Sequence, residues 1–192
     1  GLIRHEIPFG IQERSPHEHV AQNWIDYADE DVGLALFNRG TPGNNVDDGT
    51  MLLSLFRAAA MEYKAPSAGS FNEGVAHTFQ YAIMPHGSDR DVEIVRQGYA
   101  FNRPLVITKG GVSEFAQWNV APDSVFISGL RRSGDTVFIR VYEATGATVK
   151  GAIRVPEGFG SYARADGLQR ATEEFQRCDG SIPLELREIG RA

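Results

Sequence analysis

An alternation of short apolar runs with turn-forming residues is the feature that most constrains the fold of this chain. Its clearest instance lies late in the sequence, where the apolar runs 124–130 and 136–143 flank residues 131–135, Arg-Arg-Ser-Gly-Asp. Gly and Asp favour tight turns because they tolerate backbone conformations that most residues avoid. Two apolar runs joined by such a turn predict a β-hairpin.

The second run of this predicted hairpin alternates between two faces. Val137, Ile139 and Val141 fall on one side and Arg140 on the other, because successive side chains of a strand point in opposite directions. We expect the three apolar side chains to point into a core and Arg140 to point away from it. A further strand is predicted at 148–155, where it ends before a proline.

Turn-forming residues punctuate the rest of the chain as well, since its 21 Gly and 9 Pro are spread along it and not gathered into one linker. We expect strands at 33–38 and 77–84. Residues 51–61 and 168–176 have high helix propensity, and taken alone both are predicted to be helices. Strand-rich neighbours can override that propensity in the first of them. The fold class is therefore expected to be all-β.

The charge pattern excludes two classes of partner. The formal net charge is −6, with both signs interspersed, so no basic stripe indicates nucleic acid. No apolar run is long enough to cross a bilayer, and no membrane partner is expected. Cys178 is the only cysteine, which excludes an internal disulfide and a multi-cysteine zinc site, and we interpret it as an incidental thiol.

The start of the chain and its middle indicate how the protein is divided. Residues 1–6 lack the apolar stretch of a signal peptide, and we interpret them as an internal position of a longer polypeptide. A cytoplasmic location is therefore expected. A change in composition over residues 106–122 suggests a boundary near residue 112. We therefore expect one β-rich part over residues 1–112 and a second over residues 113–192.

Several groups of side chains could carry chemistry, and each also has a plainer interpretation. His17-Glu18-His19 brings two imidazoles together, but a zinc site needs a third ligand, so a solvated pair is favoured. Residues 86–91 hold a His, a Ser and two Asp, yet a catalytic triad is defined by spatial geometry, so a turn is favoured. Residues 69–74 lack a Walker lysine, which leaves phosphate binding unsupported.

Carboxylates and aromatic side chains are the remaining candidates. Paired carboxylates for glycosidic chemistry cannot be identified by spacing alone, since groups about 5–10 Å apart can come from any two strands. Aromatic rings could bind a sugar by stacking, but large aromatics in a β-sandwich more often belong to its core. The available carboxylates are Asp26, Asp47, Asp48, Glu73 and Glu143, and the aromatic candidates are Trp24, Tyr27, Trp118, Tyr142 and Tyr162.

An ordered series of short motifs over residues 6–155 resembles the C-terminal region of glycoside hydrolase family 38, the α-mannosidases. In the late hairpin, Arg140, Tyr142 and Glu143 match the Arg-x-Tyr-Glu signature of that family. The resemblance favours a strand at 52–57. The earlier motifs are PFG at 8–10, AQNWIDY at 21–27, GLALFNRG at 33–40, LLSLFR at 52–57, HTFQYAIMPHG at 77–87 and FNRPL at 101–105.

The resemblance implies a fold and a parent enzyme. The fold is part of a galactose-mutarotase-like supersandwich (residues 1–112) followed by a small terminal β-sandwich (residues 113–192). The parent enzyme hydrolyses α-mannosidic bonds with retention, and its N-terminal α/β barrel carries a zinc bound by His and Asp together with the Asp nucleophile. No segment of this chain matches those barrel motifs. No catalytic residue and no cofactor is therefore assigned here, and the zinc is expected in the missing barrel.

Two functions remain open. In the first, the chain is a non-catalytic domain that supports the missing catalytic barrel, with carbohydrate or further copies of the parent enzyme as additional candidate partners. Arg57 is then the candidate for contact with the barrel or with a sugar hydroxyl, because a guanidinium holds such groups in a planar fork. A structural ion pair is the plainer interpretation of Arg57. In the second function, the chain is a stand-alone carbohydrate-binding or scaffold domain, which an upstream barrel sequence would exclude.

Overall fold

The computed structural model describes residues 1–56, 74, 76–87, 91–105, 107, 109–110 and 118–187. The chain divides into two compact units, Gly1–Leu105 and Val106–Ala192. The predicted boundary near residue 112 lies outside the described residues and stays a prediction. Within the described part of the chain, no helix is long and apolar enough to cross a membrane.

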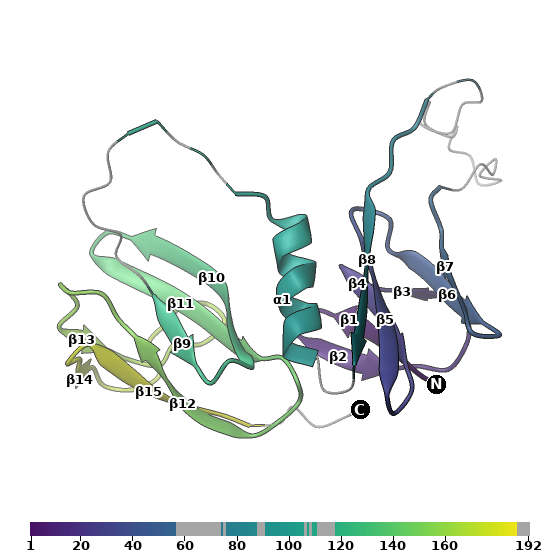
Figure 1. Ribbon diagram of the computed structural model, residues 1–192. Coiled ribbons are helices and arrows are strands. Elements are labelled where there is room, and N and C mark those ends of the chain that lie inside the picture. The colour runs from purple at the N-terminus through teal and green to yellow at the C-terminus, as the bar shows by residue number, and fades with distance from the viewer. Residues whose placement is uncertain are drawn as a thin grey trace, which may run out of the picture. The chain divides into compact units, whose positions relative to one another are not determined.

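The first unit is built on an antiparallel five-stranded sheet with the strand order β2-β1-β4-β5-β8. The strand predicted at 33–38 is confirmed as β5, and the strand predicted at 77–84 begins and ends later, as β8 (Figure 1). The strands are β1 (Leu2–Ile7), β2 (Gly10–Glu13), β4 (Trp24–Ala28), β5 (Val32–Asn38) and β8 (Tyr81–Gly87).

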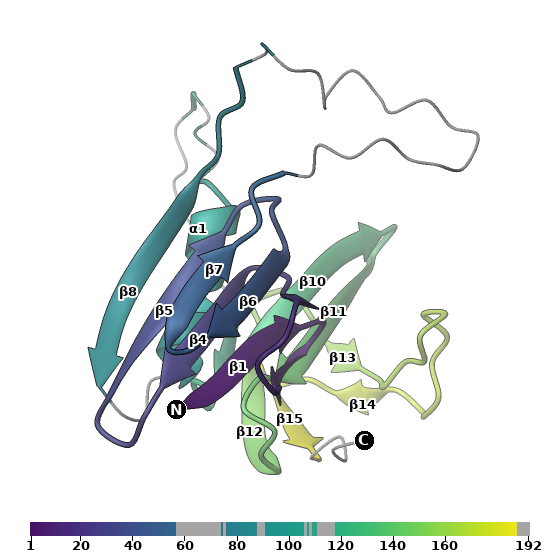
Figure 2. The ribbon, with the colours of Figure 1, turned by 90° about the vertical axis from the view of Figure 1, so that its right-hand side faces the viewer.

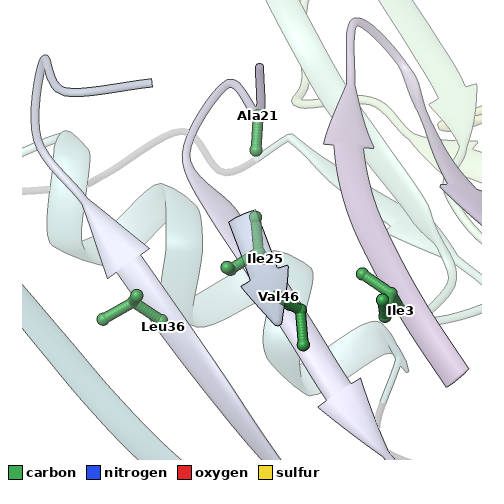
Figure 3. Packing of buried hydrophobic residues seen from close by; sticks show 5 residues of the cluster. All are labelled: Ile3, Ala21, Ile25, Leu36 and Val46. Atoms are coloured by element: carbon green, nitrogen blue, oxygen red, sulfur yellow. The ribbon is translucent and has the colours of Figure 1, made fainter. Parts of the chain in front are cut away.

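A second, three-stranded sheet contributes to the core of this unit. It contains β3 (His19–Val20), β6 (Gly43–Asp47) and β7 (Thr50–Leu53) in the order β3-β6-β7. Thr50–Leu53 is thus a strand and not the start of a helix, because Met51 and Leu53 pack on a core that alternation brings to one face. The buried residues of this core are Ile3, Ala21, Ile25, Leu36 and Val46 (Figure 3).

The opposite face of the five-stranded sheet packs against the helix α1 (Asp91–Asn102), which the motif analysis did not predict. Its buried residues Ile94, Val95 and Gly98 are spaced as one helical face requires. Asp91 and Glu93 lie in its first turn, where a carboxylate is favoured by the helix dipole. The helix ends two residues before Pro104, since a proline disfavours helical geometry in the residue that precedes it.

Cover on both faces explains why β4 departs from simple alternation of polar and apolar side chains. Trp24, Ile25 and Asp26 are all buried, and at most 1% of the surface of each residue is exposed. Ile25 belongs to the core between the sheets, whereas Trp24 lies against Gly98 of α1. A strand covered on both sides has no exposed face to give a polar period. Asp26 is therefore a charged side chain in a buried position.

The second unit contains the predicted hairpin. β10 (Val125–Ser133) pairs with β11 (Thr136–Glu143), and a bulge lies between Ile127 and Gly129. Ile139 and Val141 pack on the core of this unit, as predicted. Arg140 is exposed, which also agrees with the prediction.

The remaining strands of the second unit form two small sheets. β12 (Val149–Arg154) confirms the strand predicted at 148–155, and it lies between β15 (Ser181–Leu186) and β9 (Asn119–Ala121). β13 (Ser161–Tyr162) pairs with β14 (Gln176–Arg177). The core is formed by Ile153, Val155 and Cys178, so the lone cysteine is a buried free thiol.

The helix predicted at 168–176 is wrong. The carboxylate of Asp166 accepts hydrogen bonds from the backbone N–H groups of Leu168 and Arg170, and Gln169 has a positive φ of 65°. A side chain that binds nearby backbone donors offers an alternative to helical hydrogen bonds. The segment is accordingly a loop that leads into β14.

Candidate functional site

A group of charged side chains in the first unit surrounds Asp26. The carboxylate of Asp26 is fully buried, and its Oδ2 accepts hydrogen bonds from Nε and Nη2 of Arg4, at 3.0 Å and 2.5 Å. Its Oδ1 accepts a hydrogen bond from Nε2 of His86 at 2.6 Å. A buried carboxylate is costly unless such partners surround it. We call Arg4, Asp26, His86 and Asp91 the Asp26 cluster.

The cluster joins the sheet to the helix. Asp91, the first residue of α1, accepts a hydrogen bond from Nη1 of Arg4. Burial lowers the pKa of Arg4, but hydrogen bonds and charge from Asp26 and Asp91 outweigh it, so the pKa lies above its usual value. One guanidinium thus bridges a carboxylate of β4 and a carboxylate of α1, and it holds the start of the helix on the sheet.

His86 is fixed at both ring nitrogens. Nε2 donates to Asp26, and Nδ1 lies 2.8 Å from the carbonyl oxygen of Gly87. Hydrogen bonds on two sides thus hold the ring in place. The His86 side chain is 4% exposed and that of Asp26 is 0% exposed. A general base must reach its substrate, so the pair is suited to linking β8 to β4 across the intervening β5 and not to catalysis.

The sequence placed His86 and Asp91 in one candidate loop and Asp26 among the available carboxylates. The structure brings these three residues together, although Ser88 and Asp89 of the loop lie outside the described residues. Arg4 was missed. An aspartate between the apolar residues Ile25 and Tyr27 was the available signal, because a charge in a buried strand needs a paired cation.

A second buried polar group lies on the other face of β1. Nε2 of His5 lies 2.9 Å from Oδ1 of Asn44, whose Nδ2 donates to the carbonyl oxygen of Pro42. Nε2 is therefore the donor, and Nδ1 of His5 is buried without a hydrogen-bond partner among the described residues. Burial lowers the pKa of His5 to about 4. The ring is neutral at pH 7.

Glu6 is the other buried ionisable residue of β1 and faces the helix side of the sheet. It is 5% exposed, and its Oε2 accepts a hydrogen bond from the backbone N–H of Asn23 at 2.9 Å. Burial raises the pKa of Glu6 to about 6, although the Asn23 bond and the charge of Arg103 oppose the rise. Adjacent residues of one strand therefore have pKa values displaced in opposite directions.

Among the described residues, no third metal ligand lies beside the candidate ligands His17 and His19. Nε2 of His19 contacts the carbonyl oxygen of Ser15 at 3.0 Å, and its ring lies edge-on to that of His5 with the centroids 5.1 Å apart. His17 is exposed. Across the described residues, no three His, Cys, Asp or Glu side chains could hold one metal ion. The zinc that the family resemblance implies was expected in the missing barrel, and that expectation stays a prediction.

The other candidate carboxylates occupy separate places. Asp47 and Asp48 are exposed at the β6–β7 turn, where Asp48 has a φ of 44°. Glu143 accepts hydrogen bonds from the backbone N–H groups of Thr145, Gly146 and Ala147. Partial burial would raise the pKa of Glu143, but these bonds and the Thr145 hydroxyl lower it below the usual value. Glu143 therefore fixes the turn after β11.

The candidate aromatic residues mostly pack into the cores. Trp24 is buried, and Tyr27 lies against the core of the first unit. Trp118 and Tyr162 pack on the core of the second unit. Tyr142 stacks on Phe126 across the β10–β11 pair, with the ring centroids 5.9 Å apart. These placements favour the structural interpretation of aromatic residues in a sandwich.

One surface hollow, of 580 Å³, lies in the second unit between the end of β12 and the start of β15. Its lining includes Arg154, Glu157 and Asp179 but no aromatic side chain. Sugar-binding sites commonly stack the ligand on an aromatic ring, so the lining does not indicate a sugar site. Arg57, Glu73 and most of residues 69–74 lie outside the described residues, and their roles stay predictions.

Comparison with known proteins gives a consistent result. Residues 3–64 match the family described as "Glycosyl hydrolases family 38 C-terminal domain". "Alpha-mannosidase 2C1" of Mus musculus is 31% identical over 165 residues, which cover 76% of this chain and 15% of the mouse protein. The resemblance inferred from the motifs is confirmed.

Solved structures show the same fold. An α-mannosidase from Enterococcus faecalis V583 superposes with a TM-score of 0.76 at 15% identity, covering 97% of this chain and 23% of its own. A family 38 glycosyl hydrolase from Enterococcus faecalis superposes with a TM-score of 0.75 at 17% identity, covering 97% and 24%. The expected all-β fold class is confirmed, although the described residues also include the short helix α1. The chain spans less than a quarter of the length of each protein.

Proposed function

We propose that this chain is the non-catalytic C-terminal part of an α-mannosidase-type enzyme, because it is related to the C-terminal domains of glycoside hydrolase family 38. In this role it supports a catalytic barrel that lies outside the 192 residues and that carries the zinc. The carrying observation is that 97% of the chain superposes on under a quarter of a longer α-mannosidase.

The described side chains support a structural role within such an enzyme. The Asp26 cluster is an internal clamp, since its central carboxylate and imidazole are shielded from solvent. The carboxylates Asp47, Asp48 and Glu143 are placed at turns. Asp26 is buried and paired with Arg4 and His86, so it is not placed to act as the acid or the nucleophile of a glycosidase. The chemistry of the parent enzyme is thus assigned to the barrel.

An activity assay tests the catalytic half of the proposal. The isolated chain, with and without added zinc, is expected to give no turnover of an aryl α-mannoside. The matched experiment uses the full-length polypeptide, which should hydrolyse the same substrate and lose that activity when zinc is chelated. Turnover by the isolated chain that a substitution within residues 1–192 abolishes would overturn the proposal.

A binding assay separates the proposal from the rival function. If the chain is a stand-alone carbohydrate-binding domain, titration with α-mannosides should give saturable heats. We expect none. Saturable binding by the isolated chain, together with a coding sequence that lacks any upstream barrel, would favour the carbohydrate-binding domain instead.

A further inference from the structure

The chain contains three Asp-Gly steps, at Asp48, Asp166 and Asp179. An aspartate before glycine is prone to a rearrangement in which the backbone nitrogen of the glycine attacks Cγ of the aspartate. A five-membered succinimide ring then forms. Glycine permits the approach because it has no Cβ atom to obstruct it. The sequence alone does not distinguish the three steps, so the structure must.

The reaction needs no cofactor and no oxidant. The attacking nitrogen gives up its proton and Cγ gives up its hydroxyl group, so ring formation releases one molecule of water. Water then adds to one of the two ring carbonyl carbons. Addition at the first restores aspartate, and addition at the second leaves isoaspartate, in which the side-chain carbon has become part of the backbone. A reactive step therefore needs a carboxyl group that no donor holds, a free glycine N–H and a backbone that can rotate.

Asp166 does not meet these requirements. Its Oδ1 accepts hydrogen bonds from the backbone N–H groups of Leu168 and Arg170, and its Oδ2 accepts one from Nε of Arg170. These bonds, above all the one from the backbone of Arg170, hold the pKa of Asp166 below its usual value. The carboxylate stays ionised, which makes Cγ a poor electrophile, and it is directed to residues beyond Gly167.

Asp179 is restrained through its neighbours in the chain. Its Oδ1 accepts a hydrogen bond from Nε of Arg177 at 2.8 Å. On one side of it, the N–H of the buried Cys178 donates to the carbonyl oxygen of Gly160, and on the other the carbonyl oxygen of Gly180 accepts from the residue that follows β12. The backbone on both sides is thus bound to other segments, and rotation about Asp179 would break these bonds.

Asp48 is free of such restraints. Asp48 and Gly49 form the tip between β6 and β7, which run side by side and end their pairing at Asp47 and Thr50 (Figure 2). Both tip residues are exposed. Within the part of the chain that the structure describes, neither makes a hydrogen bond or an ion pair. A hairpin tip that bonds only to water opens at little cost in free energy.

We propose that Asp48 is the site at which the folded chain forms succinimide and isoaspartate, in preference to Asp166 and Asp179. The proposal is independent of the proposed function, since it follows from the contacts around each aspartate. All three steps have the same two reacting residues, so the difference between them lies in how the fold holds the carboxyl group and the backbone.

Isoaspartate at this tip would weaken the hairpin. It lengthens the two-residue turn by one backbone atom, and such turns fit the twist of their strands only with a defined backbone geometry. The pairing of Asp47 with Thr50 is then lost first. Met51 and Leu53 of β7 pack on the core of the first unit, so the modified chain should be less stable than the original one.

Peptide mapping of the aged chain tests the site. The chain is incubated at neutral pH below its unfolding transition and digested with trypsin, which places the three steps in the peptides 40–57, 165–170 and 178–187. Enzymatic methylation of isoaspartyl carboxyl groups should label Asp48 at least about fivefold more than either other site, because only its tip opens readily. In urea the three sites should react at similar rates. Preferential labelling of Asp166 or Asp179, equal ratios in the folded and unfolded chains, or no labelling in the folded chain would each overturn the proposal.

Matched variants give an independent readout. Asp48→Gly removes the reacting carboxyl group and keeps a pair of residues that suits a two-residue hairpin turn. This variant should form little isoaspartate and keep its Tm on ageing, whereas the unmodified chain should lose Tm. Asp179→Gly is the control and should age like the unmodified chain. Asp48→Asn should react faster, since ammonia leaves more readily than hydroxide, and its product is identified by mass. Unchanged total isoaspartate in Asp48→Gly would refute the assignment.

Discussion

Gly33 and His86 lie so close together that a Cβ atom on Gly33 would stand 2.3 Å from Cε1 of His86. The same Cβ atom would lie 2.7 Å from that of Ala28. His86 cannot move aside freely, because its ring is held by Asp26 and by the carbonyl oxygen of Gly87. The His86 side chain can therefore cross β5 to reach Asp26 only because position 33 is a glycine.

Gly33→Ala should destabilise the chain by about 1–3 kcal/mol, the usual cost of overpacking a buried site. Urea unfolding measures the change. Gly10→Ala is the matched control, because its Cβ would meet Ile7 at the ordinary contact distance of 3.7 Å. If strain against His86 is the cause, the added substitution His86→Ala should couple to Gly33→Ala in a double-mutant cycle. Equal costs at positions 33 and 10 would contradict the steric explanation.

The pKa values of His5 and Glu6 predict opposite pH dependences of stability. The pKa of His5 is about 4 in the fold and 6.5 as the reference value, so the unfolded chain binds this proton first and stability falls as pH drops from 6.5 towards 4. The pKa of Glu6 is about 6 against 4.5. The folded chain binds that proton first, and stability rises as pH drops from 6 towards 4.5.

Variants separate the two contributions between pH 7 and pH 5. On acidification over this interval, protonation linked to His5 should lower the free energy of unfolding by up to about 2 kcal/mol. Protonation of Glu6 should raise it by up to about 1 kcal/mol. Glu6→Gln should therefore lose stability more steeply on acidification than the unmodified chain. His5→Gln, which keeps a donor for Asn44, should lose less. Chemical denaturation at the two pH values checks this, and identical pH slopes in all three proteins would rule it out.

The strands could be predicted because their patterns are local. Ile139 and Val141, which pack on the core, alternate with the exposed Arg140, so the sequence period and the burial agree. β4 could not be assigned in the same way. Its residues Trp24, Ile25 and Asp26 are buried on both faces, and only the presence of α1 on the far side gives Asp26 its partners.

The two errors of helix assignment have one cause. In α1 the apolar face is a narrow stripe around Ile94 and Gly98, and its stability comes from packing on the sheet more than from propensity. In residues 168–176 the propensity is high, but the carboxylate of Asp166 binds the backbone N–H groups that a helix would use. In both cases contacts made in the folded chain outweigh intrinsic preference.

Gly98→Ala tests the packing of α1 against β4. A Cβ atom at this position would lie 2.6 Å from Cδ1 of Trp24. Helix propensity alone favours alanine over glycine by about 1 kcal/mol, but Trp24 is 1% exposed and has no room to yield. We expect a net loss of stability in urea unfolding. Gln97→Ala on the exposed side of the helix is the control, and a stabilised Gly98→Ala variant would show that the tryptophan adjusts.

Ile139→Ala tests the core of the second unit. The side chain packs on the cluster of Ile153, Val155 and Cys178 but is only half-buried. A fully buried isoleucine would lose about 2–5 kcal/mol on this change, and partial exposure reduces both the transferred area and the cavity. We therefore expect a loss of about 1–3 kcal/mol in thermal or urea unfolding.

Arg140→Ala on the same strand is the matched control for Ile139→Ala. Its side chain is exposed and lies on the opposite face of β11, and exposed substitutions away from special features usually change stability by less than about 0.5 kcal/mol. The difference between the two variants measures what the core contact contributes, because both sit on one strand and share its backbone pairing. Equal losses at positions 139 and 140 would mean that backbone strain dominates, and the assignment of the inward face would then be wrong.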